Sequence, residues 1–360
     1  MKPFLYERPR TIREAAEMAR APDAVIYAGG TTMLDLMKLG AYRPARVVDI
    51  TFLDAPAMRR ITVDGGTLRL GALVTMHAAA ENADVKRLAS VMSESLWLAA
   101  SQQLRHMATL GGNVLQRTRD PYFRDPSWVE LAGGLGGTAR DEGVDGTGAT
   151  GITAADITPY GDGRLTAVRR PTRLSAVLGT TETDTASYPG DWAQALIAFD
   201  ATVEIEGAGG RREMPFADLH VRPADKRSED EYVRLTPGEI ITGFRVSLTP
   251  ALRRSIYLKM RDRESYAFAN ASAAVGLALE DDGETVRDVR IGLGGVATVP
   301  WRARAAEDAI RGKALTPETA RAAGTAAFRD ARTSEHTAFK VPLGINVVTK
   351  ALMTLKGMEG

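Results

Sequence analysis

Two glycine pairs, each next to a hydrophobic segment, constrain the fold of this chain more than any other feature. The first stands in Tyr27-Ala28-Gly29-Gly30-Thr31-Thr32 and the second in Thr109-Leu110-Gly111-Gly112-Asn113. Glycine lets the backbone approach an anion closely, successive N–H groups can bind it, and threonine hydroxyls add donors. Two such loops suit a ligand with two neighbouring phosphates, so the sequence predicts a bound dinucleotide.

The first glycine pair lies in a segment that reads as alternating helix and strand. Thr11 and Glu14 predict a capping box that opens a helix over 12–20. A strand is expected over 24–28, a helix over 32–39 that ends at Gly40, and a second strand over 46–50. Together these elements predict a compact βαβ-like unit with the glycine pair at its centre.

The rest of the chain predicts more α/β structure and then a different pattern. The expected elements are a strand over 67–73, a helix over 85–101, a glycine-rich surface insertion over 120–175, ordered segments over 174–178 and 192–205, a charged linker over 222–234, strands over 239–248, 255–261, 271–280 and 287–292, and helices over 302–311, 317–329 and 341–353. Strands followed by helices predict an α+β domain. The fold class is therefore α/β followed by α+β.

Composition excludes several functions. A formal net charge of +1 in 360 residues gives no basic field for nucleic acid or a membrane. The charged N-terminus does not read as a signal peptide, and no apolar run reaches the ~20 residues of a membrane span. A soluble, cytoplasmic protein is expected. The chain has no cysteine and only four scattered histidines, so we expect no disulfide, no thiolate-bound cluster and no metal site.

Three further motifs do not identify a function. Residues 146–151 match G-x-G-x-x-G, but they lie inside the glycine-rich insertion and lack the preceding strand and following helix of a dinucleotide fingerprint. No Walker lysine follows either glycine pair, which argues against nucleotide hydrolysis. His77 and His106 are interpreted as ordinary histidines, although His106 precedes the second pair. The sequence therefore assigns no catalytic residue.

The residues around both glycine pairs resemble a known family. Residues 27–32, with Leu36-Met37-Lys38-Leu39, resemble the first FAD loop of the flavoprotein (medium) subunits of molybdenum hydroxylases, the xanthine dehydrogenase and carbon monoxide dehydrogenase family. Arg105-His106-Met107-Ala108, leading into 109–113, resembles the second FAD loop. Lys259-Met260-Arg261-Asp262-Arg263 and the later Ser272-Ala273-Ala274 resemble its C-terminal domain. The likeness covers nearly the whole chain apart from the insertion.

This resemblance implies FAD as the cofactor and a two-domain architecture. The FAD-binding domain, of the PCMH type, would span 1–225 in two lobes (1–58 and 59–225), and the smaller α+β domain would span 235–355. It implies that FAD lies between the lobes, with its pyrophosphate at the first loop and other contacts at the second. Asp191 would lie near the ribityl or flavin end, and Ile241 and Lys259 near the adenine or the isoalloxazine. The cofactor-binding residues expected are Tyr27, Ala28, Gly29, Gly30, Thr31, Thr32, Thr109, Gly111, Gly112, Asn113, Asp191, Ile241 and Lys259.

The chain departs from one branch of that family in an informative way. The periplasmic-type aldehyde oxidoreductase flavoprotein carries an extra four-iron cluster, and the resemblance places its cysteines at Asp120, near Ala149 and at Asp184. None of these positions is cysteine here, so that cluster cannot form through thiolates.

The function implied is that of an FAD-dependent oxidoreductase. In this interpretation the flavin takes electrons from iron–sulfur clusters on a partner chain and passes them to NAD⁺, quinone or oxygen, with molybdopterin and iron–sulfur subunits as partners. Two alternatives stay open: a free-standing flavoenzyme acting on a small organic substrate, and a flavin-binding scaffold without turnover. A homo-oligomer is also left open. The substrate and the electron acceptor are not identified by the sequence.

Overall fold

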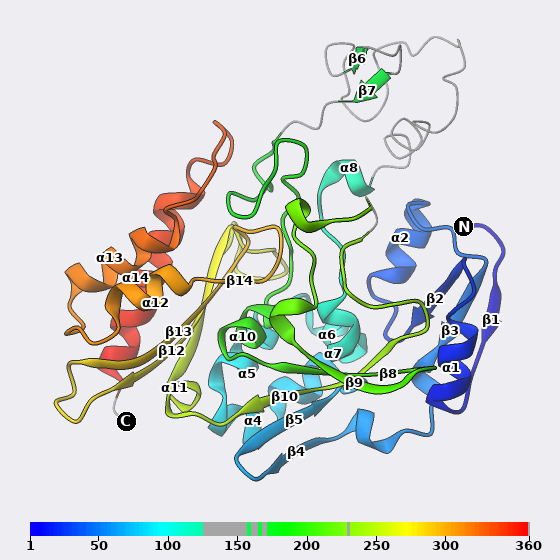
Figure 1. Cartoon of the computed structure of the whole chain (residues 1–360), viewed down its shortest axis with the longest axis horizontal. Helices are drawn as coiled ribbons and strands as arrows, with labels where there is room; N and C mark the ends of the chain where they lie inside the picture. The colour runs from blue at the N-terminus through cyan, green and yellow to red at the C-terminus, as the bar shows by residue number, and fades with distance from the viewer. Residues whose placement is uncertain (125–156, 160–164, 168–170, 229–230, 359–360) are drawn as a thin grey trace.

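The computed structural model describes residues 1–124, 157–159, 165–167, 171–228 and 231–358. Most of the predicted insertion, including the G-x-G-x-x-G match and Ala149, lies outside these residues. Two hydrophobic cores organise the described chain: a larger one built mostly from the N-terminal part and a second one built mostly from the C-terminal domain. Figure 1 shows the arrangement of the elements around them.

The N-terminal lobe is built on a parallel sheet. Its central strand, β3 (Arg46–Asp49), pairs in parallel with β1 (Leu5–Glu7) on one side and with β2 (Ala24–Tyr27) on the other. Helix α2 (Met33–Leu39) connects β2 to β3, so the predicted βαβ-like unit is confirmed.

The helix signals read from the sequence of this lobe are also present. Helix α1 (Ile12–Met18) begins after Thr11, which forms the predicted capping box with Glu14. Helix α2 ends at Gly40, whose φ of 79° is the left-handed conformation that glycine adopts freely. Local capping chemistry therefore decides both helix ends.

A five-stranded antiparallel sheet follows, in the order β4-β5-β10-β8-β9. Its strands are β4 (Ile61–Asp64), β5 (Thr67–Gly71), β8 (Thr202–Gly207), β9 (Gly210–Pro215) and β10 (Ile240–Ser247). Strand β9 is absent from the sequence prediction. The sequence also grouped β10 with the C-terminal strands, whereas the structure places it between β5 and β8, with Ile240, Ile241, Phe244 and Val246 buried in the larger core.

Helices fill the space above this sheet, and one prediction about them is wrong. The single helix expected over 85–101 is broken into α4 (Ala83–Leu88) and α5 (Ser90–Trp97) at Ala89, whose φ is −152°. A tertiary contact lies directly beside the break, where the Ser90 hydroxyl donates to the Ser255 carbonyl at 2.6 Å. The remaining helices here are α3 (Met76–Glu81), α6 (Gln102–Met107), α7 (Leu110–Val114), α8 (Pro121–Arg124) and α10 (Trp192–Ala198).

The C-terminal domain is an antiparallel sheet with helices, as predicted. Its order is β11-β12-β13-β14, formed by Ser255–Met260, Ala271–Leu279, Val286–Gly294 and Trp301–Arg302. Helices α12 (Arg304–Ile310), α13 (Pro317–Ala327) and α14 (Lys340–Gly357) cover one face, and α5 and α10 of the N-terminal part pack against the other (Figure 1). The two domains therefore share an extensive boundary.

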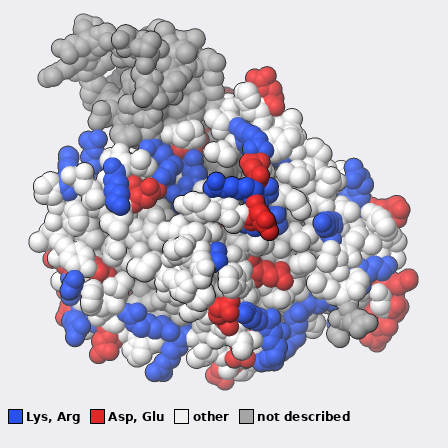
Figure 2. Space-filling view, turned by 180° about the vertical axis from the view of Figure 1, so that it is seen from behind, with Lys and Arg blue, Asp and Glu red and all other residues white. Residues whose placement is uncertain are grey.

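Short elements complete the described chain. They are the hairpin of β6 (Ile157–Pro159) and β7 (Leu165–Ala167), helix α11 (Pro250–Arg253), and 3-10 turns at Ile50–Phe52, Pro56–Arg59, Phe216–Asp218 and Pro223–Asp225. Acidic and basic side chains are interspersed over the face shown in Figure 2, in line with the near-zero net charge. Among the described residues, no helix combines the length and apolar character that crossing a bilayer requires.

Candidate functional site

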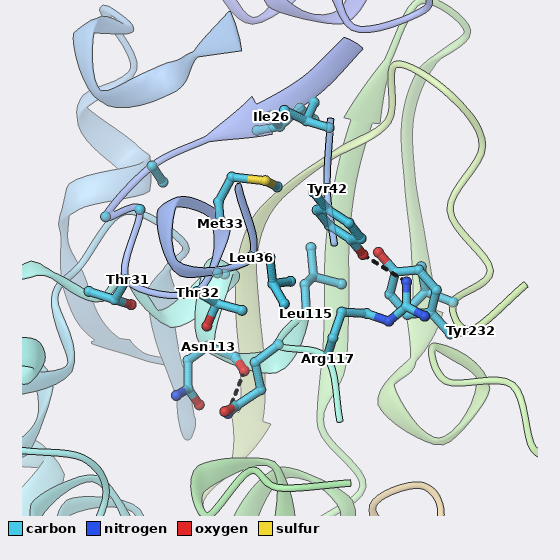
Figure 3. A pocket seen from close by; sticks show the side chains of 18 of the residues that line it. Ile26, Thr31, Thr32, Met33, Leu36, Tyr42, Asn113, Leu115, Arg117 and Tyr232 are labelled. Atoms are coloured by element: carbon cyan, nitrogen blue, oxygen red, sulfur yellow. Dashed lines mark hydrogen bonds between the residues drawn. The ribbon is translucent and has the colours of Figure 1, made fainter. Parts of the chain in front are cut away.

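A large cleft lies where the N-terminal lobe, the α6–α7 region and the C-terminal domain meet. Its volume of about 1870 Å³ exceeds the range of about 300–1,000 Å³ that is usual for small-molecule pockets. Both glycine pairs line it, and Figure 3 shows Thr31, Thr32 and Asn113 from the two regions close together. The cleft is therefore large enough for an extended ligand.

The first glycine pair presents unused backbone donors to this cleft. Within the described chain, the N–H groups of Gly30, Thr31 and Thr32 donate to no protein acceptor. Gly30 has a φ of +69°, which turns the chain from β2 into α2. Thr32 precedes α2 without capping it through its side chain. Converging N–H groups of this kind are the arrangement that binds anions in other proteins, so the phosphate-binding role of this loop stays a prediction.

Direct backbone contact joins the two glycine regions. A Cβ atom added to Gly29 would lie 2.0 Å from the carbonyl oxygen of Met107. Met107 and Ala108 immediately precede the second pair, so the first loop rests on the start of the second. Gly29 is therefore needed for packing between the loops.

The second glycine pair differs from the expectation that it would offer free N–H groups. It lies inside helix α7, where Leu110 donates to the Val74 carbonyl, Gly111 to Ala72 and Asn113 to Thr109, at 2.8–2.9 Å. The Thr109 hydroxyl accepts the remaining N–H, that of Gly112, at 3.4 Å. Its N–H groups are thus already satisfied by the protein.

Helix α7 is also held at its far end. The Val114 carbonyl accepts from the Tyr188 hydroxyl at 3.0 Å and from Nε2 of His220 at 2.9 Å. Desolvation lowers the pKa of His220 to about 4, and the bond to Val114 opposes this shift. A neutral His220 therefore supports α7 at neutral pH.

Asn113 supplies the polar group that α7 turns toward the cleft. Its amide nitrogen lies 3.4 Å from the sulfur of Met76, while its Oδ1 is buried and has no hydrogen-bond partner among the described residues. Buried acceptors are normally satisfied, so an unpaired Oδ1 beside a cleft is a position where a ligand donor fits.

Another part of the cleft carries a buried ion pair. The Asp191 carboxylate, at the start of α10, accepts from Lys259 Nζ at 2.8 Å and from the Tyr257 hydroxyl at 2.6 Å. Lys259 also donates to the carbonyl of Leu98 at 2.9 Å. Burial raises the pKa of Asp191, and the Lys259 ammonium opposes that rise. The pair connects the C-terminal strand β11 to the N-terminal part of the molecule.

The structure brings together twelve of the thirteen expected binding residues. Ala28, Gly29, Gly30, Thr31, Thr32, Thr109, Gly111, Gly112, Asn113, Asp191, Ile241 and Lys259 line the cleft. Tyr27 does not; its ring lies beneath Gly30, where a Cβ on that glycine would come within 2.4 Å of it.

Sequence reasoning missed a cluster that lines the cleft beyond the loops. Tyr42, Arg117 and Tyr232 converge there, from the α2–β3 loop, the segment after α7 and the predicted linker (Figure 3). No periodic signal in the sequence unites these positions.

Two of the three positions matched to cluster cysteines, Asp120 and Asp184, lie within the described residues. Asp184 accepts from Lys226 Nζ at 2.7 Å, and Asp120 is buried at the start of α8. Within the residues that the structure describes, no group of three or more histidine and carboxylate side chains is placed to bind a metal ion.

An open set of N–H donors in a cleft of this size defines a protein that binds an elongated anionic ligand. The family model "FAD binding domain in molybdopterin dehydrogenase" matches residues 2–248, and "CO dehydrogenase flavoprotein C-terminal domain" matches residues 255–355. The chain belongs to this family of FAD-binding oxidoreductase subunits, and its cofactor is FAD.

Individual relatives agree with that assignment. The chain is 36% identical to the aldehyde oxidoreductase FAD-binding subunit PaoB of Escherichia coli over 98% of each chain. It is 24% identical to the carbon monoxide dehydrogenase medium chain of Hydrogenophaga pseudoflava, over 90% of this chain and 86% of that one.

Solved structures show the same fold. Carbon monoxide dehydrogenase from Hydrogenophaga pseudoflava superimposes with a TM-score of 0.70 at 24% identity, covering 98% of this chain and 96% of that one. The reconstituted enzyme from Oligotropha carboxidovorans gives 0.71 at 20% identity and covers both chains fully. The predicted fold class is confirmed.

Proposed function

We propose that this chain holds FAD in the cleft and relays electrons between a molybdopterin- and iron–sulfur-containing partner and an acceptor. The observation that carries the proposal is that the N–H groups of Gly30, Thr31 and Thr32 have no acceptor among the described residues, in a cleft that both glycine regions line. Bound FAD would supply the redox chemistry, while the protein supplies binding, orientation and electrostatics.

The residues present fit this cofactor in three respects. The first loop offers donors for a pyrophosphate, and Asn113 Oδ1 offers an unpaired acceptor. Lys259 and Asp191 place fixed charges at the cleft wall, where charge near ring nitrogens tunes a flavin. Ile241 is buried in β10 and adds apolar surface. We assign FAD contacts to these residues and to the rest of the cleft-lining set.

Work within a complex is favoured over the two alternatives. The relatives that match nearly the full length are named as a subunit and a medium chain. The chain has no cysteine, so clusters that exchange electrons with its flavin through thiolate-bound iron would reside on partner chains.

Absorption spectroscopy of the purified chain, with mass analysis of the released cofactor, tests the FAD assignment. A flavin spectrum with FAD released is expected, and a colourless protein that takes up no added FAD would contradict the assignment. Co-purification from the native source tests the complex: molybdopterin and iron–sulfur subunits should accompany the chain. Steady turnover of a small organic substrate by the isolated chain would instead favour the free-standing alternative.

A further inference from the structure

Strand β11 presents alternate side chains to the N-terminal part of the molecule. Because residues two apart on a strand point to the same face, Ser255, Tyr257 and Lys259 lie together on one face of β11, which packs against α5. Ser255 Oγ accepts from the N–H of Val91 at 3.3 Å, and Tyr257 and Lys259 both donate to Asp191. One strand therefore holds both the domain boundary and the ion pair at the cleft wall.

Asp191 is hydrogen-bonded at both of its carboxylate oxygens. Its Oδ1 accepts from the Tyr257 hydroxyl at 2.6 Å, and its Oδ2 accepts from Lys259 Nζ at 2.8 Å. The side chains of Asp191 and Lys259 are 6% and 1% exposed, and Tyr257 is 2% exposed. An unpaired carboxylate oxygen is costly in such a buried place, so each of the two donors stabilises the ionised form of Asp191.

The Tyr257 side chain is held firmly in this position. Its backbone N–H donates to Glu94 Oε2 on α5 at 2.7 Å, while its hydroxyl donates to Asp191 at the start of α10. Burial raises the pKa of Tyr257 well above its usual value, so the hydroxyl keeps the proton that it donates. Tyr257 is thus a fixed donor that determines where Asp191 Oδ1 lies.

Only one of the two donors to Asp191 lines the cleft. Lys259 and Asp191 are part of the cleft wall, and Tyr257 is not. An ammonium group has three N–H groups, and Asp191 and the Leu98 carbonyl accept two of those of Lys259. The third has no acceptor among the described residues. Tyr257 can therefore influence a ligand in the cleft only through Asp191.

We propose that Tyr257 is a positioning residue for the flavin and acts through Asp191. By holding Oδ1, it keeps Asp191 ionised and directs Oδ2 to Lys259, so the wall presents a compensated ion pair instead of a lone ammonium. A lone positive charge would favour reduced FAD, which carries more negative charge than oxidised FAD. Tyr257 thereby sets how strongly the cleft distinguishes the two redox states. The proposal rests on the proposed function, since it requires the flavin to lie near Asp191.

The test measures the midpoint potential of FAD bound to the full-length protein, which reports the relative affinity for reduced and oxidised FAD. Asp191→Asn removes the negative charge and keeps the shape of the side chain. It should favour reduced FAD by roughly tenfold, a positive shift of about 30 mV for a two-electron couple. Tyr257→Phe removes one donor from a buried carboxylate, which then takes up a proton more readily. Its shift should therefore be positive and smaller, and an unchanged potential would overturn the positioning role.

The double variant shows whether Tyr257 acts through Asp191. Tyr257→Phe combined with Asp191→Asn should shift the potential no further than Asp191→Asn alone, because the carboxylate that Tyr257 holds is then absent. Additive shifts would show that Tyr257 acts by another route and would contradict the proposal.

Tyr188→Phe is the matched control. Tyr188 is also buried and donates its hydroxyl once, but to the Val114 carbonyl at 3.0 Å. Its loss should leave the potential unchanged, whatever it does to thermal stability. Equal shifts in Tyr188→Phe and Tyr257→Phe would indicate general loosening of the protein and would sink the proposal. If the wild-type protein bound no FAD, the proposed function itself would fail, which distinguishes the two claims.

Discussion

The two glycine pairs look alike in sequence and differ in structure. At the first pair the N–H groups from Gly30 to Thr32 have no acceptor in the part of the chain that the structure describes, and the backbone enters the left-handed region at Gly30. At the second pair the N–H groups are bonded within the protein, and the glycines lie in helix α7. A shared pattern of small residues thus serves an open donor set in one place and close packing in the other.

The difference teaches that glycine content alone does not identify an anion site. What decides is whether the neighbouring chain already supplies acceptors, as Ala72 and Val74 do for α7. The second region contributes to the cleft through Asn113 and through its support of the first loop at Met107.

We expect the largest loss of stability and FAD affinity from a substitution at the contact between the two glycine regions. Gly29→Ala places a methyl group against the Met107 carbonyl, and relieving that clash requires the loops to separate. We expect a cost of about 3 kcal/mol, equivalent to roughly a hundredfold loss of FAD affinity. Flavin titration and thermal unfolding measure it. Gly209→Ala, at a glycine with open space around it, is the control and should change neither FAD affinity nor thermal stability. Wild-type FAD affinity in Gly29→Ala would show that the contact is dispensable.

The stability that His220 contributes by holding helix α7 of the second glycine region should depend on pH. The pKa of His220 is about 4 when folded against an ordinary value of 6.5, so the unfolded chain binds the proton more readily between these values. Stability is therefore complete above pH 6.5 and falls by about 3 kcal/mol as the pH drops to 4. Urea unfolding at several pH values measures this. His220→Gln should flatten that dependence, and replacing the exposed His336 should not.

Alanine at one glycine of each pair should act in opposite directions on stability. Gly30→Ala forces a residue with a Cβ into the left-handed region and against Tyr27, at a cost of about 1–2 kcal/mol. Gly112→Ala meets only the Thr109 hydroxyl and gains helix propensity, so a gain of up to about 0.5 kcal/mol is expected. Equal destabilisation of the flavin-free protein by both variants would contradict the comparison.

The two threonines should show the smallest and most selective effects. Thr109→Ala removes a helix cap and should cost about 1 kcal/mol of stability. Thr32 forms no side-chain cap, so Thr32→Ala should leave stability unchanged and weaken FAD by about threefold to tenfold through a lost hydroxyl. Calorimetry of binding and urea unfolding, run in parallel with the serine variants as controls, separate these outcomes. Equal losses of stability in Thr32→Ala and Thr109→Ala would contradict the expectation that only Thr109 caps a helix.

Local chemistry made much of this fold predictable. The capping box of α1 and the glycine that ends α2 act over a few residues, so the βαβ unit follows from the sequence. The C-terminal strands and helices likewise follow from their periodicity. The local pattern did not indicate the break at Ala89, which lies beside a contact of Ser90 with Ser255, far along the chain.

The site was predictable where its residues are neighbours in sequence. The glycine regions are short continuous segments, and all but Tyr27 of the residues expected from the first line the cleft. The satisfied N–H groups of α7 depend on carbonyls near Val74, which no local pattern indicates. The group formed by Tyr42, Arg117 and Tyr232 comes from three distant segments, so only the folded chain reveals it.

The ion pair of Asp191 and Lys259 has a consequence for when the newly synthesised chain can bind its cofactor. Every other expected contact of the cofactor is encoded before residue 242, but Lys259 lies on β11, in the C-terminal domain. A nascent chain that has emerged only as far as β10 has both glycine regions but lacks this wall of the cleft. If Lys259 contacts the flavin, we expect cofactor loading to be complete only once the C-terminal domain has been synthesised and docked, and a tightly held flavin would then mark a chain that has completed its folding.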